Sequence, residues 1–297
     1  MKTAATKRGT ILITGATGFL GSHVLGALLR SGRDVIVLKR SFSHTGRIRD
    51  LIPLVRTYDI DRAGCEAVFS ENSIDTVIHC ATNYGRRQDN PFSVIQANLM
   101  LPLQLLYAGR QHGIKTFINT DTVLDKRINY YSLSKSHFAD WLRMMSSHMK
   151  CVTLSLEHFY GPGDDRTKFV TSMVRQLLEG VPRIDLTKGG QKRDFIHVDD
   201  VVGAFLTVLE NMETISSGYH KMEVGSGNTI TIRDFVEKLK VMTGNTATEL
   251  NFGALEYREN EVMESHVDIA GICGLGWQPK ISLDDGLSAT IEQERGN

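Results

Sequence analysis

Residues 10–21, "TILITGATGFLG", decide the fold of this chain. Residues 10–14 form an apolar run, typical of a buried strand, that leads directly into glycines 15, 18 and 21. The segment "GSHVLGALLRSG" that follows has the apolar spacing of a helix and ends at a glycine. The order strand, glycine turn, helix is the arrangement that opens a dinucleotide-binding domain.

Each glycine in this turn has a physical role in that arrangement. Gly15 allows the sharp turn off the strand, and Gly18 lets backbone N–H groups approach a pyrophosphate. Gly21 lets the helix pack closely on the sheet, with its N-terminus facing the phosphates. The G-x-x-G-x-x-G spacing differs from the standard fingerprint. A glycine-rich turn without a ligand is the alternative, but the strand before it and the helix after it favour binding.

Apolar runs and helical segments alternate along the first half of the chain. Further strands are expected at 34–40, 55–60, 76–81, 116–121 and 151–156, and helices at 61–72, 90–112 and 131–149. Apolar strands separated by helices indicate a parallel sheet covered on both faces. The expected fold class is therefore α/β, a doubly wound parallel sheet of Rossmann type.

The second half of the chain is less regular. Helices are expected at 167–180, 201–212 and 231–244, with short strands and loops over 183–200. We expect residues 9–160 to form the dinucleotide-binding domain, with returning segments near 192–212. Residues 161–297 are expected to form mainly a smaller, mixed C-terminal lobe.

Composition excludes several functional classes. Lysine plus arginine equals aspartate plus glutamate at 34 each, so no net basic field exists to hold nucleic acid or a membrane surface. The four cysteines (65, 80, 151 and 273) lie far apart and the histidines show no metal-ligand spacing, so neither a metal site nor a disulfide framework is expected. No signal peptide or membrane-spanning apolar run is evident. These features predict a cytoplasmic globular protein.

The end of the second expected strand, "VIVLKRS", bears on the choice of cofactor. An NAD-binding domain usually places an acid there to hold the ribose 2′-hydroxyl, whereas this chain has Lys39, Arg40 and Ser41. Two cations and a hydroxyl attract a 2′-phosphate. We therefore expect NADPH in preference to NAD(H). The alternative is that Lys39 and Arg40 merely cap a solvated strand end.

A candidate catalytic pair lies in "NYYSLSK", residues 129–135. Tyr131 and Lys135 are one helical turn apart and share a face, whereas the residue four positions after Tyr130 is Ser134. A nearby ammonium lowers the pKa of a phenol and brings it within range for proton transfer. The preceding strand ends in Thr120, Asp121 and Thr122, and a hydroxyl there could hydrogen-bond a substrate oxygen. Tyr131 as a plain helix-surface aromatic is the alternative.

The chain resembles the extended short-chain dehydrogenase/reductase family, the epimerases, dehydratases and ketoreductases of nucleotide sugars. The resemblance covers nearly the whole chain. It rests on "TGATGFLG", "YDID" (58–61), "HCAT" (79–82), "YSLSK", "YGPGDD", "QKRDFIHVDDVV" (191–202), "MEVGSGNTITI" (222–232) and "LGWQPKISLDDGL". These motifs are specific for family and fold, and much less specific for the reaction.

The resemblance implies roles for individual residues. The implied catalytic residues are Thr120, Tyr131 and Lys135, with Thr122 as the alternative hydroxyl. The implied cofactor-binding residues are Gly15, Thr17, Gly18, Phe19, Leu20, Gly21, Lys39, Arg40, Ser41, Asp59, Ile60, Cys80, Ala81, Thr82, Asn98, Tyr131, Lys135 and His158. The implied substrate-binding residues are Tyr84, Asp121, Thr122, Thr167, Lys168, Phe169, Arg193 and Arg258, which makes the C-terminal lobe mainly a nucleotide-sugar site. Packing at the domain seam is the alternative for Tyr84, and a solvated surface cation is the alternative for Arg258.

Departures from the family pattern narrow the reaction. Family dehydratases resemble this chain at residues 120–123, where they have T-D-E-V. Here Thr122 stands in place of the glutamate, so a carboxylate able to abstract a proton is missing. The segments "ATNYGR" (81–86), "NTDTVLDKRINYYSLSK" and "LEHFYGPGDD" are most similar to a branch of the family, the CDP-paratose and CDP-abequose synthases.

This similarity implies NADPH-dependent reduction of a 4-keto group on a nucleotide-linked 4-keto-6-deoxy or 3,6-dideoxy hexose in O-antigen deoxysugar synthesis. The alternatives are an NAD-dependent epimerase or 4,6-dehydratase and, more remotely, a non-catalytic NADP-binding sensor. Related ketoreductases act on dTDP or GDP sugars, so the base is left open. The helices at 90–112 and 131–149 resemble those that form a homodimer interface in the family.

Overall fold

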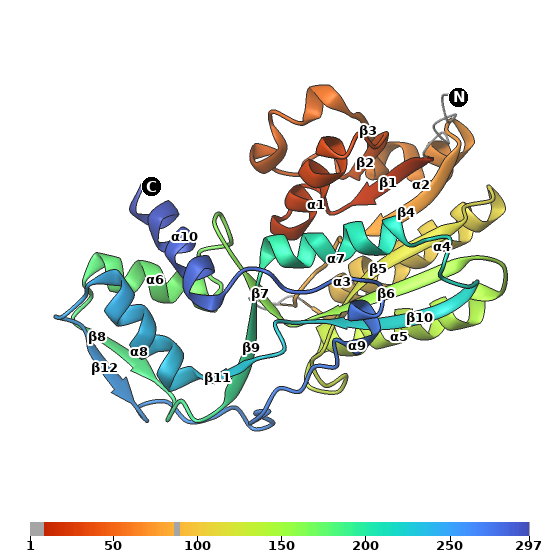
Figure 1. Ribbon diagram of the computed structural model, residues 1–297. Coiled ribbons are helices and arrows are strands. Elements are labelled where there is room, and N and C mark those ends of the chain that lie inside the picture. The colour runs from red at the N-terminus through yellow and green to blue at the C-terminus, as the bar shows by residue number, and fades with distance from the viewer. Residues whose placement is uncertain (1–8, 86–89, 297) are drawn as a thin grey trace. The chain divides into compact units, whose positions relative to one another are not determined.

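The computed structural model describes residues 9–85 and 90–296 (Figure 1). Its largest sheet has seven strands in the order β10-β6-β5-β4-β1-β2-β3. These strands are β1 (Thr10–Thr14), β2 (Val35–Lys39), β3 (Arg56–Asp59), β4 (Ile74–His79), β5 (Thr116–Thr122), β6 (Lys150–Leu156) and β10 (Gly218–Val224). The pairs β1–β2, β1–β4, β2–β3 and β4–β5 are parallel. The expected doubly wound, Rossmann-type α/β fold is confirmed.

Helices cover this sheet because its strands are apolar on both faces. They are α1 (Phe19–Arg30), α2 (Ile60–Ser70), α3 (Pro91–Ile95), α4 (Leu101–Gln111), α5 (Tyr130–Met145) and α7 (Val198–Glu210), with short turns η1 (Gly46–Ile48), η2 (Ile52–Leu54) and η4 (Ser146–His148). One core joins alternate strand residues such as Leu12, Val77 and Phe117 to Leu105 of α4 and Phe138 of α5. Neighbouring strand residues such as Ile13 and Ile78 are equally buried on the other face.

The helix expected over 90–112 is continuous but contains a π-helical turn. Residues Gln96–Met100, element η3, have π geometry between α3 and α4. Pro102 follows in the first turn of α4 and has no N–H to donate, so the regular hydrogen-bond ladder is interrupted there. The wider turn includes Asn98, a predicted site residue.

The chain divides into two compact units. The first contains the described residues up to Ser155 together with Phe205–Met222, and the second contains Leu156–Ala204 and the described residues from Glu223 onward. The predicted ranges, 9–160 and 161–297, assign functions to parts of the chain, and that assignment stays a prediction.

The second unit is built from two small sheets and helices. Strands β11 (Thr229–Thr231), β9 (Lys192–His197) and β7 (His158–Tyr160) form one sheet, and β12 (Glu249–Phe252) pairs with β8 (Arg183–Leu186). The helices are α6 (Phe169–Glu179), α8 (Ile232–Thr243), α9 (Ala270–Cys273) and α10 (Leu283–Arg295). Its core is centred on Phe195 and Phe235, whose rings stack with centroids 4.1 Å apart. The smaller mixed lobe expected from sequence is therefore present.

Candidate active site

The glycine turn after β1 leaves no room for side chains. A Cβ on Gly21 would lie 2.1 Å from the carbonyl oxygen of Gly15, and one on Gly15 would lie 2.4 Å from the nitrogen of Ala81. Gly15 also has φ +72°, a conformation that favours glycine. The turn therefore contacts the segment Cys80–Ala81 directly, as the two motifs predicted to bind one cofactor require. The first turn of α1 carries no acidic residue, so its N-terminus can face an anion.

In the structure, two carboxylates from later segments, Asp59 and Asp61, lie against the end of β2. The ammonium of Lys39 forms an ion pair with Asp59 of β3, its register partner. The Ser41 hydroxyl and backbone N–H both donate to Asp61, at 2.6 and 2.7 Å, and the hydroxyl bond lowers the Asp61 pKa. The Arg40 guanidinium lies over the ring of Phe42, 4.8 Å from its centroid. Sequence reasoning missed Asp61, because it belongs to the next βα unit along the chain.

The candidate catalytic residues converge at the carboxyl end of β5. The Lys135 side chain is 1% exposed, and its ammonium donates to the carbonyl oxygen of Thr120 at 3.0 Å. Burial lowers the pKa of Lys135 from 10.5 to about 8, and the negative charge of Asp121 opposes that shift. The Thr120 hydroxyl donates to the carbonyl oxygen of His79 at 3.0 Å.

The two adjacent tyrosines have different surroundings. Tyr130 is 57% exposed, whereas Tyr131 is half-buried and its ring lies against Tyr84, with centroids 5.1 Å apart. The Asn129 side chain accepts from the backbone N–H of Ser132 and caps α5, which fixes where the helix begins. The structure therefore places Tyr84 against Tyr131, with Lys135 one helical turn further along α5.

Asn98 joins three segments around this cluster. Its side-chain oxygen accepts from the N–H of Asn83 at 2.8 Å, and its amide donates to the Asn83 carbonyl at 2.7 Å. The same amide donates to the Ser134 hydroxyl of α5 at 3.0 Å. Fully buried, Asn98 thus ties the loop after β4 to the helix that carries Lys135.

Two further buried groups, His79 and Thr14, were not predicted as site residues. The Nδ1 atom of His79 lies 2.8 Å from the Thr14 hydroxyl oxygen, which also accepts from Ala81 N–H at 3.4 Å. Burial, together with the charge of Lys135, keeps the His79 pKa well below its usual range. Burial also raises the pKa of the Cys80 thiol to about 12, so this cysteine is not a thiolate nucleophile.

The Asp121 carboxylate of β5 is hydrogen-bonded by two nearby residues of the chain, Lys126 and Thr122. Its Oδ1 atom accepts from Lys126 Nζ at 2.9 Å and from the N–H of Thr122 at 2.8 Å. Thr122, the alternative hydroxyl, accepts from Leu124 N–H at 3.2 Å. Lys126 was not predicted, because nothing in the sequence spacing connects it to the strand.

Three predicted residues of the second unit, Arg193, Arg258 and His158, lie near other charged groups. The Arg193 guanidinium pairs with Glu261 and donates to the carbonyl oxygens of Lys192 and Val262. Arg258 is exposed and close enough for its charge to lower the Arg193 pKa further, beyond the larger effect of burial. His158 lies 3.0 Å from the buried Glu157 carboxylate.

Three predicted residues precede or open α6. Thr167 is exposed and donates to Asp165 at 2.7 Å. The Lys168 ammonium lies 5.8 Å from the centroid of the Phe159 ring. Phe169 stacks on Phe195 at 6.3 Å, continuing the aromatic core of this unit to its surface.

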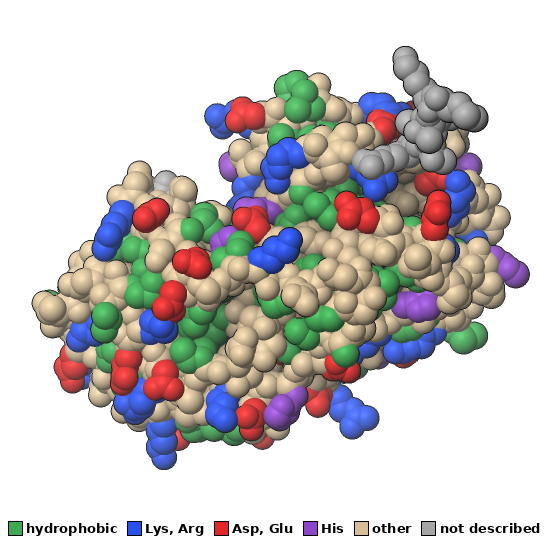
Figure 2. Space-filling view, in the orientation of Figure 1, with side chains coloured by type: hydrophobic (Ala, Val, Ile, Leu, Met, Phe, Trp, Pro, Cys, Tyr) green, Lys and Arg blue, Asp and Glu red, His purple; other side chains and the backbone are tan. Residues whose placement is uncertain are grey.

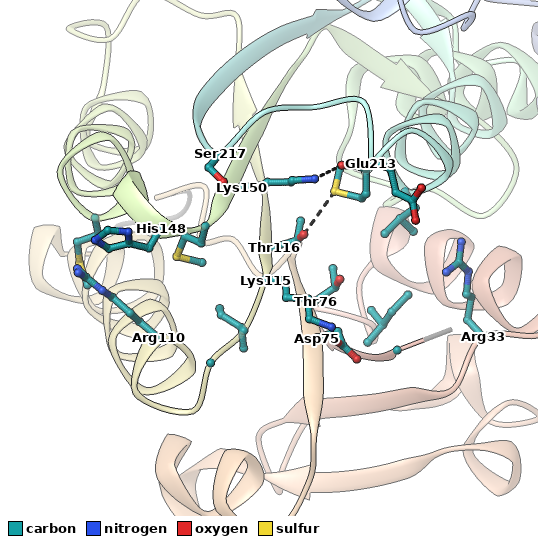
Figure 3. A pocket seen from close by; sticks show the side chains of 18 residues that line it. Arg33, Asp75, Thr76, Arg110, Lys115, Thr116, His148, Lys150, Glu213 and Ser217 are labelled. Carbon is teal, nitrogen blue, oxygen red and sulfur yellow. Dashed lines mark hydrogen bonds and ion pairs between the residues drawn. The ribbon is translucent and has the colours of Figure 1, made fainter. Parts of the chain in front are cut away.

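A cavity of about 710 Å³ lies in the first unit, at the amino ends of β4, β5 and β6 (Figure 3). It contains none of the predicted site residues. Several of its polar side chains are partnered: Lys115 pairs with Asp75, Lys150 donates to the Met212 carbonyl and the Thr116 hydroxyl donates to the Met212 sulfur at 3.4 Å. The cavity is therefore distinct from the candidate site, which lies at the opposite ends of the same strands.

Residues 11–225 of this chain match the family model described as "NAD dependent epimerase/dehydratase family". The chain belongs to that family. It is accordingly an NAD(P)-dependent oxidoreductase-type enzyme. A CDP-abequose synthase of Salmonella muenchen is 32% identical over 96% of this chain and 97% of its own length.

Solved structures with the same fold include two 4-epimerases. UDP-glucose 4-epimerase of Thermotoga maritima, solved with UDP-glucose, superposes with a TM-score of 0.84 at 26% identity, covering 97% of this chain and 99% of its own. UDP-glucuronic acid 4-epimerase of Bacillus cereus, solved with UDP-glucuronic acid and NAD, gives the same TM-score, identity and coverage.

Residues 9–85 and 90–296 contain neither a membrane-spanning helix nor a metal-binding group. None of the helices there is long and apolar enough to span a membrane. In the same residues, no three His, Cys, Asp or Glu side chains gather in a group that could hold a metal ion.

The buried Lys135 predicts a distinctive dependence of stability on pH. Because its folded-state pKa is about 8 and its ordinary value is 10.5, the unfolded chain binds more protons between these values. The free energy of unfolding of the cofactor-free protein should therefore gain up to about 3 kcal/mol from this residue as pH rises through that window. Urea unfolding of wild type and Lys135→Met across the window measures this gain as a difference in slope.

Lys115→Met is the matched control, because Lys115 is an exposed lysine of the same unit. It should follow the wild-type pH dependence. Parallel curves for wild type and Lys135→Met would contradict the depressed pKa.

Proposed function

We propose that this chain catalyses NADPH-dependent reduction of the 4-keto group of a nucleotide-linked 4-keto-6-deoxy or 3,6-dideoxy hexose, in deoxysugar biosynthesis. The observation that carries the proposal is the buried Lys135 ammonium, which is bonded to Thr120 at the end of β5 and lies one helical turn after Tyr131. The same unit contains a glycine turn with no room for side chains. Near-complete alignment with a CDP-abequose synthase supports a CDP-linked substrate.

The residues around the glycine turn fit a dinucleotide. The missing Cβ atoms of Gly15 and Gly21 let the turn pack against Cys80–Ala81 and let the start of α1 pack against the turn. Gly18 would let backbone N–H groups approach a pyrophosphate, and α1 supplies a helix N-terminus. When bound, the nicotinamide cofactor supplies the hydride that becomes the C4–H bond of the sugar. Lys39, Arg40 and Ser41 would lie near the 2′-phosphate, and Asp59 and Ile60 near the adenine.

The proton in the reduction would come from Tyr131. As the carbonyl carbon gains a hydride, its oxygen develops negative charge and takes the phenolic proton, giving the alcohol and leaving a phenolate beside Lys135. The ammonium of Lys135 stabilises that phenolate. Thr120 would hold the substrate oxygen, exchanging its hydrogen bond to His79 for one to the ketone.

Elimination of water fits this site less well. Thr122 provides no carboxylate, and the Asp121 carboxylate is bound to Lys126. An NAD-dependent 4-epimerase is the second candidate, favoured by one observation: Asp59 neutralises Lys39 and Asp61 holds Ser41. Both acids would oppose a 2′-phosphate.

The second unit would hold the nucleotide sugar. Arg193 and Arg258 would pair with the diphosphate, and Thr167, Lys168 and Phe169 would line the nucleotide site. Tyr84 would contact the sugar beside Tyr131, and His158 would face the nicotinamide. We also propose a cytoplasmic location, since all four cysteines are free thiols, as expected in a reducing compartment.

We further propose a homodimer formed through exposed apolar side chains on α3, η3, α4 and α5, here called the helical patch. Tyr130, Leu133, Trp141 and Met144 lie at positions i, i+3, i+11 and i+14 of α5, which share one face. Phe92, Ile95, Met100 and Tyr107 extend the patch over α3, η3 and α4. The packing of α4 on α5 brings these residues into one surface.

The catalytic assignment predicts opposite results for the two adjacent tyrosines. Tyr131→Phe should lower kcat by about 10²–10⁴-fold, because it removes the proton donor while keeping the ring. Tyr130→Phe, the matched control, should leave turnover essentially unchanged. Both are measured as NADPH oxidation with a CDP-4-keto-3,6-dideoxyhexose, and wild-type activity of Tyr131→Phe would overturn the assignment.

The cofactor assignment predicts a selective effect of charge reversal at Arg40. Arg40→Glu should raise the Kd for NADPH about 10–100-fold while changing that for NADH little, the size expected for losing a charge-assisted bond. Arg56→Glu is the control, since Arg56 begins β3 and pairs with Asp34, at the far end of the strand. Fluorescence titration gives both constants, and equal effects on the two cofactors would favour the epimerase candidate.

The dimer predicts that charge in the helical patch produces monomers. Trp141→Glu combined with Met144→Glu should halve the mass measured by sedimentation equilibrium, because the carboxylates cannot be desolvated at an apolar interface. Val241→Glu, on α8, is a control of similar exposure, at 80% for both Val241 and Met144. A monomeric wild type, or an unchanged mass for the double variant, would contradict the proposal.

A further inference from the structure

Two lysines hold the carboxyl end of β5. Lys135, from α5, donates to the carbonyl oxygen of Thr120, and Lys126, from the loop before α5, donates to that of Thr122. Carbonyls two residues apart on a strand point the same way, so the two ammonium groups lie along one side of the strand end. Asp121 stands between the two threonines in sequence.

Asp121 is 5% exposed, so its carboxylate needs a nearby cation. Lys126, whose side chain is 31% exposed, supplies it at 2.9 Å. The same Oδ1 atom accepts a hydrogen bond from the backbone N–H of Thr122 at 2.8 Å, so the carboxylate is also bonded to the backbone of its own strand. This ion pair therefore links the loop before α5 to the last residues of β5.

The ion pair also acts on the charge of Lys135. Asp121 raises the Lys135 pKa and Lys126 lowers it, both more weakly than burial does. The two residues thus place opposite charges next to one buried ammonium. Their sum, rather than either charge alone, sets the local potential.

We propose that Lys126 is a positioning residue for the reduction: paired with Asp121, it holds the end of β5 in place and balances the charge around Lys135 and Tyr131. This inference rests on the proposed function for its link to turnover. It assigns a role to a loop lysine that neither the spacing of the motif nor the family match singles out.

Other titratable groups also face this site. His79 ends β4, Cys80 and Tyr84 lie in the loop after it, Tyr131 lies on α5 and Tyr219 lies on β10. Burial raises the pKa of Tyr219, and the charge of Asp121 adds a smaller increase. His79 and Cys80 are both held neutral near pH 7 by burial. Asp121 and Lys126 are therefore the pair whose removal changes the charge beside Lys135.

The test compares variants of the two partners. Removing the cation in Lys126→Met should raise the pKa of Lys135, and removing the anion in Asp121→Asn should lower it, each by about 0.5–1 pH unit. The double variant should return close to wild type, and Lys126→Arg should keep the wild-type value. Lys115→Met, an exposed lysine of another ion pair, controls for loss of any lysine.

The first readout needs no substrate. The protein labelled with ¹³C-lysine is titrated by NMR, and the Lys135 Cε signal is assigned by its loss in Lys135→Arg. Shifts of opposite sign in the two single variants support the charge role. No shift, or shifts of the same sign, would overturn it even where the variants are less stable.

The second readout is the pH dependence of kcat/KM for NADPH-dependent reduction. The basic limb, where the proton donor is lost, should move to higher pH in Lys126→Met and to lower pH in Asp121→Asn. A purely structural role would lower kcat/KM at every pH without moving the limb. If wild type reduces no 4-keto nucleotide sugar, the proposed function fails, and the NMR titration still decides the role of Lys126.

Discussion

The buried ammonium of Lys135 is the constraint on which the candidate active site depends. A lysine with 1% of its surface exposed costs free energy unless it is bonded and balanced, and here a strand carbonyl and the Asp121 carboxylate do both. Its helix is in turn tied to the loop after β4 through Asn98 and Ser134. The sheet, the π-helical turn and the capped start of α5 together fix one charge beside one phenol.

That arrangement shows why the sequence distinguishes Tyr131 from Tyr130 as the candidate proton donor. The two tyrosines differ by one position, but a helix turns about 100° per residue, so only one of them shares a face with Lys135. The structure shows the consequence: Tyr130 is exposed and Tyr131 lies against Tyr84. The glycine turn was equally accessible to sequence reasoning, because its requirement for missing side chains is local.

Other features were out of reach because they depend on contacts between distant segments. Strand β10, "GYHKMEV", was not predicted because it mixes polar and apolar residues, yet it adds to the sheet beside β6 as an edge strand. Asp61, in the first turn of α2, reaches Ser41 because β2 and β3 are neighbours in the sheet, and Lys39 meets Asp59 only through strand register. Lys126 lies in a loop whose sequence gives no periodic signal. For the three charged residues, Asp61, Lys39 and Lys126, the sequence shows the charge, but only the folded structure determines which group it pairs with.

The fold and the family leave the reaction to be decided by the site itself. Solved 4-epimerases and a CDP-abequose synthase align over almost the whole chain, so chain coverage does not separate reduction from epimerisation. The residues that bear on this choice are few: Arg40, Lys39 and their acids at the cofactor end, and Asp121, Thr122 and Lys126 at the substrate end.

The central claim is that NADPH transfers a hydride to the sugar and that this hydrogen stays in the product. Isotope transfer tests this claim most directly. With NADPH fully deuterated at C4 of the nicotinamide and a CDP-4-keto-3,6-dideoxyhexose, mass spectrometry and NMR should find one deuterium at C4 of the product alcohol for each NADPH oxidised. An alcohol without deuterium, or interconversion of 4-epimers by retained NAD without net NADPH oxidation, would contradict the account.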